Sequence, residues 1–180
     1  MVPETPVDPT DALSAYAQAL QSSTTGERFA LSYIDEDEIP ELFIFDGDFH
    51  FSAPEIYTYV NGTIINLGRY GSNGSVTVAK KQNLLCSFYG GMGNMDYSYY
   101  TLQDGAAVLV QSIGYYVEYS GTEKTTYNID EVQVSEAEYQ QAEEWYESQY
   151  AWTELHYGDS FDISADHIEA MQRQYGQYLK

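Results

Sequence analysis

Hydrophobic positions repeat with helical spacing in three segments of the chain. The first segment follows Thr10, a residue suited to the N-cap, and its apolar face consists of Leu13, Tyr16, Ala17 and Leu20. The second follows Ser135, which forms a Ser-x-x-Glu capping box with Glu138, and the third follows Ser164. Their apolar stripes are Tyr139, Ala142, Trp145 and Tyr146 in the second segment, and Ile168, Met171, Tyr175 and Leu179 in the third. The pattern predicts one N-terminal and two C-terminal helices.

Between the first and second helices, the chain alternates short β-rich runs with turn residues. Two turns carry the strongest signal, since Asn61-Gly62 and Asp104-Gly105 favour type I′ hairpins, whose central residues both need positive φ. A further turn is expected over 120–123. The predicted strands cover 29–34, 41–45, 55–60, 63–67, 96–103, 106–113, 115–119 and 125–129. Successive hairpins predict a curved antiparallel β-meander, so the expected fold class is α+β with all three helices on one face of the sheet.

The two-residue turn at Asn61-Gly62 fixes the register of its hairpin. That register places Tyr57 and Tyr59 on one face, and we expect this face to be solvated because the opposite face is more apolar. In the second hairpin, Tyr97 and Tyr99 also share a face. The sequence contains 19 Tyr residues, and tyrosine suits both half-buried sheet faces and recognition surfaces. The four tyrosines are therefore candidate ligand-binding residues, the alternative being a solvated sheet face without a ligand.

Length and charge limit the classes of function. The 180 residues suit a single domain, with 1–10 as a proline-containing extended tether and 11–180 as the folded unit. A formal net charge of -21 argues against a nucleic-acid partner and leaves divalent cations, basic peptides and basic proteins as candidates, the alternative being that the charge simply keeps the protein soluble. Within the second helix, Glu143 and Glu147 form a like-charge pair four residues apart, which destabilises a helix by a few tenths of a kcal/mol.

Cysteine usage and hydropathy bear on the location of the protein. Cys86 is the one cysteine, so no internal disulfide forms, and its apolar neighbours predict a small buried side chain. No segment approaches the length needed for a transmembrane helix, and no signal peptide is evident. We expect a mature extracellular or cell-surface protein whose signal has been removed, with possible lipid attachment in its precursor.

An acidic loop lies between the first two predicted strands. Asp35, Asp37 and Glu41 alternate with other residues in a way that places carboxylate oxygens around one point, as calcium requires. The segment resembles exported proteins of Gram-positive bacteria with an Asp-x-Asp-x-Asp-Gly-x-x-Glu-Leu loop, related to the calcium loops of dockerins and FG-GAP propellers. Tyr33 replaces the first acidic residue and Glu38 the turn glycine, so the loop is degenerate. The resemblance implies calcium as a cofactor, the alternative being a structural turn.

These observations favour a non-catalytic binding module for a protein or glycan. Aromatic rings stack on sugars, but both tryptophans lie in or near the second helix rather than among the tyrosines, which favours a protein ligand. The first alternative is a structural accessory domain of a surface lipoprotein, which predicts tyrosines packed beneath helices. The second is a hydrolase, which requires a pocket with convergent carboxylates or a His beside an acid.

Overall fold

The computed structural model describes residues 9–119 and 124–180. Most of the predicted tether and the predicted turn at 120–123 lie outside the described residues. The last two tether positions, Pro9 and Thr10, belong to the first helix rather than to an extended segment. The structure is mixed α and β, with three α-helices and antiparallel sheets in the described chain, so the predicted fold class is confirmed.

The second and third helices begin where their capping residues predict, whereas the first begins at Pro9, so Thr10 lies inside it instead of at its N-cap. The capping box is formed, because the Ser135 amide donates to Glu138 Oε2 at 2.8 Å and the Glu138 amide donates to Ser135 Oγ at 3.3 Å. Ser164 caps the last helix through the His167 amide. The α-helices are α1 (Pro9–Ser22), α2 (Glu136–Gln149) and α3 (Ala165–Gln174), and the 3-10 turns are η1 (Tyr157–Asp159) and η2 (Tyr175–Gln177).

The strands form two sheets instead of one continuous meander. The five-stranded sheet has the order β12 (Phe161–Asp162), β1 (Arg28–Ser32), β2 (Glu41–Phe45), β3 (Glu55–Val60) and β4 (Thr63–Arg69). The seven-stranded sheet has the order β10 (Val132–Val134), β9 (Lys124–Ile129), β8 (Ala106–Glu118), β7 (Asn94–Gln103), β6 (Leu84–Gly91), β5 (Ser75–Ala79) and β11 (Trp152–His156). Within each sheet, neighbouring strands are antiparallel.

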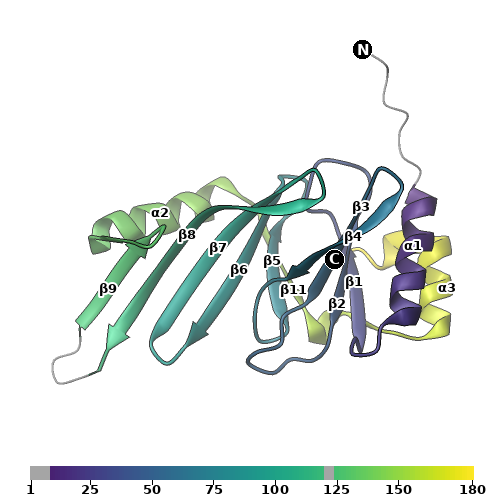
Figure 1. The fold of residues 1–180 in the computed structure, drawn as a ribbon, viewed down its shortest axis with the longest axis horizontal. Helices are drawn as coiled ribbons and strands as arrows, with labels where there is room; N and C mark the ends of the chain where they lie inside the picture. The colour runs from purple at the N-terminus through teal and green to yellow at the C-terminus, as the bar shows by residue number, and fades with distance from the viewer. Residues whose placement is uncertain (1–8, 120–123) are drawn as a thin grey trace, which may run out of the picture.

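The helices are divided between the two sheets. Helices α1 and α3 pack on the five-stranded sheet, whereas α2 packs on the seven-stranded sheet (Figure 1). The expectation that all three helices would cover one face of one sheet is therefore wrong. The physical reason lies in β2, where Leu42, Phe43, Ile44 and Phe45 are all buried. A strand that is apolar on both faces needs a covering layer on each side.

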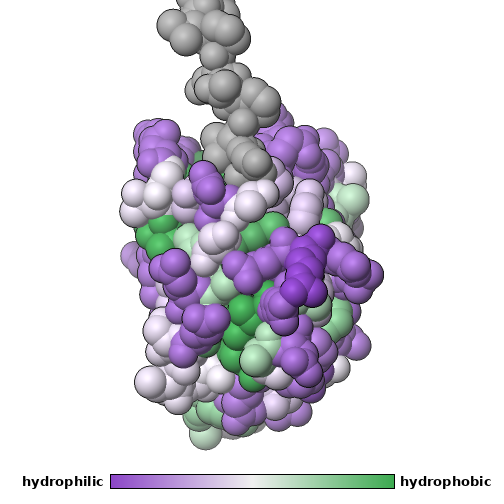
Figure 2. Space-filling view, turned by 90° about the vertical axis from the view of Figure 1, so that its right-hand side faces the viewer, coloured by the Kyte–Doolittle hydropathy of each residue, from purple (hydrophilic) through white to green (hydrophobic). Residues whose placement is uncertain are grey.

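A core cluster between the sheets provides that second layer. Phe43, Phe45 and Ile56 from the first sheet pack with Val76, Val78 and Leu85 from the second. Ile44 and Leu42 point the other way and contact the cluster formed with α1 and α3. The helical end of the molecule presents mainly hydrophilic residues to solvent, with hydrophobic ones in small areas (Figure 2).

Two-residue turns connect several strands. The predicted turn at Asn61-Gly62 has φ values of 51° and 80°, and it sets the expected register of Tyr59 opposite Ile64 and Tyr57 opposite Asn66. Asp104-Gly105 behaves in the same way. Positive φ values also occur in pairs at Asn73-Gly74 and Met92-Gly93.

The face of β3 that carries Tyr57 and Tyr59 is covered by α1 instead of facing solvent. Tyr59 retains 8% of its exposure and belongs to the core beneath α1, and Tyr57 packs against that core. The prediction of a wet tyrosine face on this hairpin is therefore wrong. The prediction assumed that only one side of the hairpin is covered by other parts of the protein. In the structure, the apolar stripe of α1 packs on the tyrosine side as well.

Candidate functional site

A row of side chains crosses four neighbouring strands of the seven-stranded sheet. Glu154 on β11 lies opposite Thr77 on β5, Thr77 lies opposite Cys86 on β6, and Cys86 lies opposite Tyr99 on β7. Residues in one such row point to the same face of a sheet. Here that face is the one on which α2 packs, and the row forms the floor of a cavity.

Stacked rings form one end of this cavity. The Tyr146 ring of α2 lies on the Tyr99 ring with centroids 3.5 Å apart, and the Trp152 ring centroid is 6.0 Å from that of Tyr99. Trp152 Nε1 donates a hydrogen bond of 3.1 Å to the Tyr146 carbonyl. This bond uses a carbonyl of the last turn of α2, which has no partner within the helix, and it fixes the indole at the helix end.

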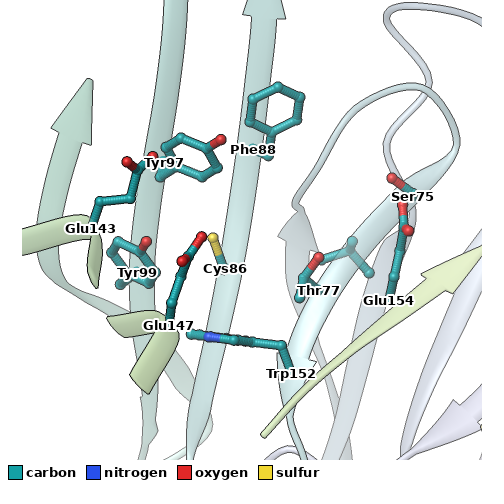
Figure 3. A pocket seen from close by; sticks show the side chains of 11 residues that line it. Ser75, Thr77, Cys86, Phe88, Tyr97, Tyr99, Glu143, Glu147, Trp152 and Glu154 are labelled. Carbon is teal, nitrogen blue, oxygen red and sulfur yellow. The ribbon is translucent and has the colours of Figure 1, made fainter. Parts of the chain in front are cut away.

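A second aromatic pair forms the opposite end. Phe88 on β6 and Tyr97 on β7 are cross-strand partners with ring centroids 5.1 Å apart. Figure 3 shows them across the cavity from Trp152, with Cys86 between the two ends. The cavity has a volume of about 300 Å³ and is called the aromatic pocket below; it is lined by Ser75, Val76, Thr77, Cys86, Phe88, Tyr97, Tyr99, Glu143, Glu147, Trp152 and Glu154.

The position of α2 explains why a cavity exists here. The helix packs over β8 and β9, and its buried residues Tyr139 and Tyr146 join the core of the seven-stranded sheet. Strands β5, β6 and β11 lie beside the helix (Figure 1). The pocket is the space between the side of α2 and this less covered part of the sheet.

Three carboxylates surround the aromatic pocket. Glu143 and Glu147 descend from α2, and Glu154 rises from β11 (Figure 3). Glu143 is half-buried and its Oε1 accepts a hydrogen bond of 3.1 Å from the Tyr139 hydroxyl. In the parts of the chain that the structure describes, no Lys, Arg or His forms an ion pair with any of the three. Their negative charge is thus not balanced from within the described protein.

The remaining polar groups of the pocket are neutral near pH 7. Burial raises the pKa of the Cys86 thiol to about 12, although a hydrogen bond with Tyr99 lowers it in part. Burial also raises the pKa of Tyr97, and the nearby Glu143 carboxylate raises it further. The pKa of Tyr99 is raised by burial first and then by Cys86. Because a thiol needs its thiolate form to react, Cys86 is an inert wall residue, as its apolar neighbours predicted.

Of the four tyrosines predicted to bind a ligand, the structure brings two together here. Tyr97 and Tyr99 line the pocket, although Tyr99 is only 5% exposed, whereas Tyr57 and Tyr59 lie on the other sheet beneath α1. Sequence reasoning missed the lining residues Phe88, Glu143, Glu147, Trp152 and Glu154. One signal was present, the unfavourable Glu143–Glu147 spacing, whose cost had no compensation within the helix.

The carboxylates of the acidic loop accept hydrogen bonds from backbone amides of the same loop. Glu41 is 1% exposed, and its Oε2 accepts from the Ile34 amide at 2.7 Å while its Oε1 accepts from the Thr58 hydroxyl at 3.2 Å. Asp37 Oδ1 accepts from the Ile39 amide at 2.7 Å, and Asp35 Oδ1 accepts from the Asp37 amide at 3.1 Å. These bonds are those of a structural turn.

Electrostatics in this loop are unfavourable for ionised carboxylates. Burial raises the pKa of Glu41 well above its usual range, and Asp35 adds to the rise. Partial burial raises the pKa of Asp37 to about 6, with a further contribution from Asp35. Across residues 9–119 and 124–180, no three His, Cys, Asp or Glu side chains are grouped closely enough to hold a metal ion. Calcium binding at Asp35, Asp37 and Glu41 is thus a prediction from the sequence alone, and the hydrogen bonds of the loop favour the alternative, a structural turn.

Comparison with known proteins adds little to this geometry. No protein-family model and no curated protein matches the chain. One solved structure, described as a Xanthomonas type IV secretion system related protein, aligns with a TM-score of 0.44 and 15% identity. The alignment covers 64% of this chain and 61% of the other, and similarity at this level carries no functional argument. Within the described residues, no helix has the length and apolar character needed to cross a membrane.

Proposed function

We propose that this domain is a non-catalytic binding module, that its ligand is a protein, and that the aromatic pocket is the ligand site. One observation carries the proposal: Phe88, Tyr97 and Trp152 are only half-buried and line a cavity that reaches solvent. Aromatic side chains in a concave site supply large contact area at low entropic cost, which is why they dominate protein recognition sites. We propose that this binding takes place outside the cell or at its surface, where the net charge of -21 would keep the domain soluble.

The structural accessory domain is the first alternative, and a specific observation favours it. Tyr59 and Tyr99 are buried beneath helices, as that alternative predicts. The two hypotheses differ in the role they give to the half-buried rings of Phe88, Tyr97 and Trp152 in the aromatic pocket. If the domain has no ligand, then blocking the aromatic pocket has no effect beyond stability.

A hydrolase is the second alternative, because three carboxylates around an aromatic pocket suit a glycosidase. Such an enzyme needs one carboxyl kept protonated by burial and a second carboxylate held about 5–9.5 Å away. Glu147 and Glu154 are exposed, and Glu143 accepts a hydrogen bond from the Tyr139 hydroxyl, so the first condition is not favoured. Release of reducing ends from a mixture of polysaccharides, lost in Glu143→Gln, is the result that would support this alternative.

The binding module is tested by selecting ligands for the pocket. A random peptide library displayed on phage is panned against the wild-type domain, and selected peptides are measured against two variants. Thr77→Trp places an indole on the pocket floor, and Thr63→Trp makes the same change at an exposed position of β4, away from the pocket. We expect selected peptides to bind the wild type and Thr63→Trp equally and to lose binding to Thr77→Trp.

Thermal unfolding of both variants accompanies the binding measurement, so that loss of structure is not mistaken for loss of the site. Peptides that bind Thr77→Trp as tightly as the wild type would move the site elsewhere. Panning that selects no peptides would favour the structural accessory domain.

A further inference from the structure

We infer that the aromatic pocket receives the cationic end of a lysine or arginine side chain from a basic segment of a partner protein; this deepens the proposed function and depends on the pocket being its ligand site. The inference combines two independent features of the cavity. Its walls are aromatic rings, and its rim carries unbalanced negative charge.

No basic residue of the described chain forms an ion pair with the rim carboxylates. Glu143 and Glu147 are one helical turn apart on α2, and Glu154 faces the pocket from β11 (Figure 3). None of the three is in an ion pair with a Lys, Arg or His of the parts described. Like charges at this spacing repel, so a cation that enters between them relieves a strain already present in the free protein.

The walls are suited to the same cation. A Lys or Arg head group over an aromatic face gains about 0.5–2 kcal/mol, and Trp is the best such surface. Within residues 9–119 and 124–180, the cation–π pairs involve Tyr33, Tyr157 and Phe161, all outside the pocket. Phe88, Tyr97 and Trp152 are in none of these pairs, and all three line the cavity and are only half-buried, so a cation that enters the cavity meets their rings.

The arrangement selects an organic cation over a metal ion. A metal ion requires several ligand atoms converging at about 2–2.6 Å, and no three acidic, His or Cys side chains in the described chain are grouped for that. Here the carboxylates stand apart around a ring-lined space. A lysine or arginine side chain has a charged head group on an apolar stem, so it can contact both the rings and the carboxylates of the rim.

Volume and charge favour a polypeptide as the source of that cation. A cavity of about 300 Å³ is at the lower limit for ligand sites, which suits one side chain better than an oligosaccharide. Glu147 and Glu154 are exposed, so the pocket opens to solvent and leaves room for the rest of a chain. The net charge of -21 attracts a basic segment over a long range, an effect that is weaker for a single small amine.

Two capped tripeptides test the inference directly. Acetyl-Gly-Lys-Gly-amide and its norleucine analogue differ in the ammonium group alone, and the arginine peptide forms a third arm. Binding is followed by tryptophan fluorescence in a Trp145→Phe background, in which Trp152 is the one remaining tryptophan. We expect the lysine and arginine peptides to bind about tenfold more tightly than the norleucine peptide, with the difference reduced by salt.

A matched pair of variants locates the effect. Glu143→Gln should weaken lysine-peptide binding several-fold and leave norleucine-peptide binding unchanged. Glu144→Gln makes the same change of charge on the adjacent exposed residue, which does not line the pocket, and should alter neither. Equal melting temperatures for the two variants exclude a folding defect as the cause.

Each other outcome contradicts a different statement. If the lysine and norleucine peptides bind equally well, the inference of a cationic ligand is wrong, but the proposed binding module still stands. The same conclusion follows if all three tripeptides fail to bind while binding of the phage-selected peptides still requires an open pocket. Binding of n-butylammonium as tightly as the lysine peptide overturns the polypeptide source. Failure of the tripeptides together with failure of phage selection removes the proposed function itself.

Discussion

The ring of Tyr146 lies flat on the ring of Tyr99, with centroids 3.5 Å apart and an interplanar angle of 2°. Tyr146 belongs to α2 and Tyr99 to β7, so this stack joins the helix to the sheet. Both side chains are buried. Tyr99 lines the aromatic pocket, and the Tyr146 carbonyl accepts a hydrogen bond from the indole of Trp152, which lines it too. One residue of α2 thus contributes both to stability and to the shape of the candidate site.

Replacing Tyr146 with alanine should lower the free energy of unfolding by about 3 kcal/mol, because a large buried aromatic ring is removed from its partner. Urea unfolding followed by circular dichroism gives this value. Trp145→Ala, the same kind of truncation at the neighbouring half-exposed position, should cost clearly less. Equal losses for the two variants would show that the Tyr146–Tyr99 stack is not what holds α2 on the sheet.

Ionisation of the buried Glu41 carboxyl should lower the stability of the protein as the pH rises. Its pKa in the folded state lies above that of the unfolded chain because of burial, and Asp35 adds to this. The folded state therefore binds the proton more tightly, and stability falls as the pH increases from about 4 through the folded pKa. Asp37 acts in the same direction, with a folded pKa of about 6.

Glu41→Gln removes the ionisable group and keeps an oxygen for the Ile34 amide. The measurement is the melting temperature between about pH 5 and pH 8, a range that lies above the usual glutamate pKa. We expect the melting temperature to fall less over this range in the variant than in the wild type. Glu36→Gln, an exposed change in the same loop, should preserve the wild-type slope. A slope unchanged in Glu41→Gln would contradict the raised pKa.

Calcium should leave the melting temperature unchanged, because the Asp35, Asp37 and Glu41 side chains already accept hydrogen bonds within the protein. Thermal unfolding in EDTA, in millimolar calcium and in millimolar magnesium makes the comparison. An ion that binds the folded state alone must raise stability. A rise specific to calcium, and lost in both Asp35→Ala and Asp37→Ala, would instead establish the ion site that the loop resembles.

Local signals in the sequence predicted most of the elements. Ser135 and Ser164 mark helix starts because their caps depend on neighbouring residues alone, and Asn61-Gly62 fixes a hairpin register for the same reason. The division into two sheets was not predicted, since it depends on which distant segment covers the second face of β2. The continuous apolar run Leu42–Phe45 was the available indication that both faces are buried.

The candidate site was predicted only in part, for the same physical reason. Tyr97 and Tyr99 share a face through strand alternation, which is a local property. Trp152 and Glu154 join them through pairing of β11 with β5, which is separated from β11 by more than seventy positions in the chain (Ala79 to Trp152 in the register). The role of α2 as a lid over one side of the sheet depends on tertiary packing as well.

Two turn glycines with similar backbones should respond differently to alanine. Gly62 has φ of +80° with no atom within 4 Å of an added Cβ, so Gly62→Ala meets only the cost of a left-handed conformation, about 1–2 kcal/mol. Gly74 has φ of +67°, and its Cβ would lie 2.4 Å from the Gly47 carbonyl oxygen and 2.7 Å from Asp48 Cα. Because these atoms are backbone, the loop cannot yield by rotating a side chain.

Gly74→Ala should therefore lower the free energy of unfolding clearly more than Gly62→Ala does, as measured by urea unfolding. The excess has a local origin: Gly74 donates from its amide to the Ser52 carbonyl at 2.9 Å, and its own carbonyl accepts from the Tyr157 amide at 2.8 Å. Displacement of Gly74 disturbs both bonds, which tie the start of β5 to the segment before β3 and to η1. If the two variants lose equal stability, the close approach of Gly74 to Gly47 is not a constraint on the fold, and left-handed strain alone sets the cost at both turns.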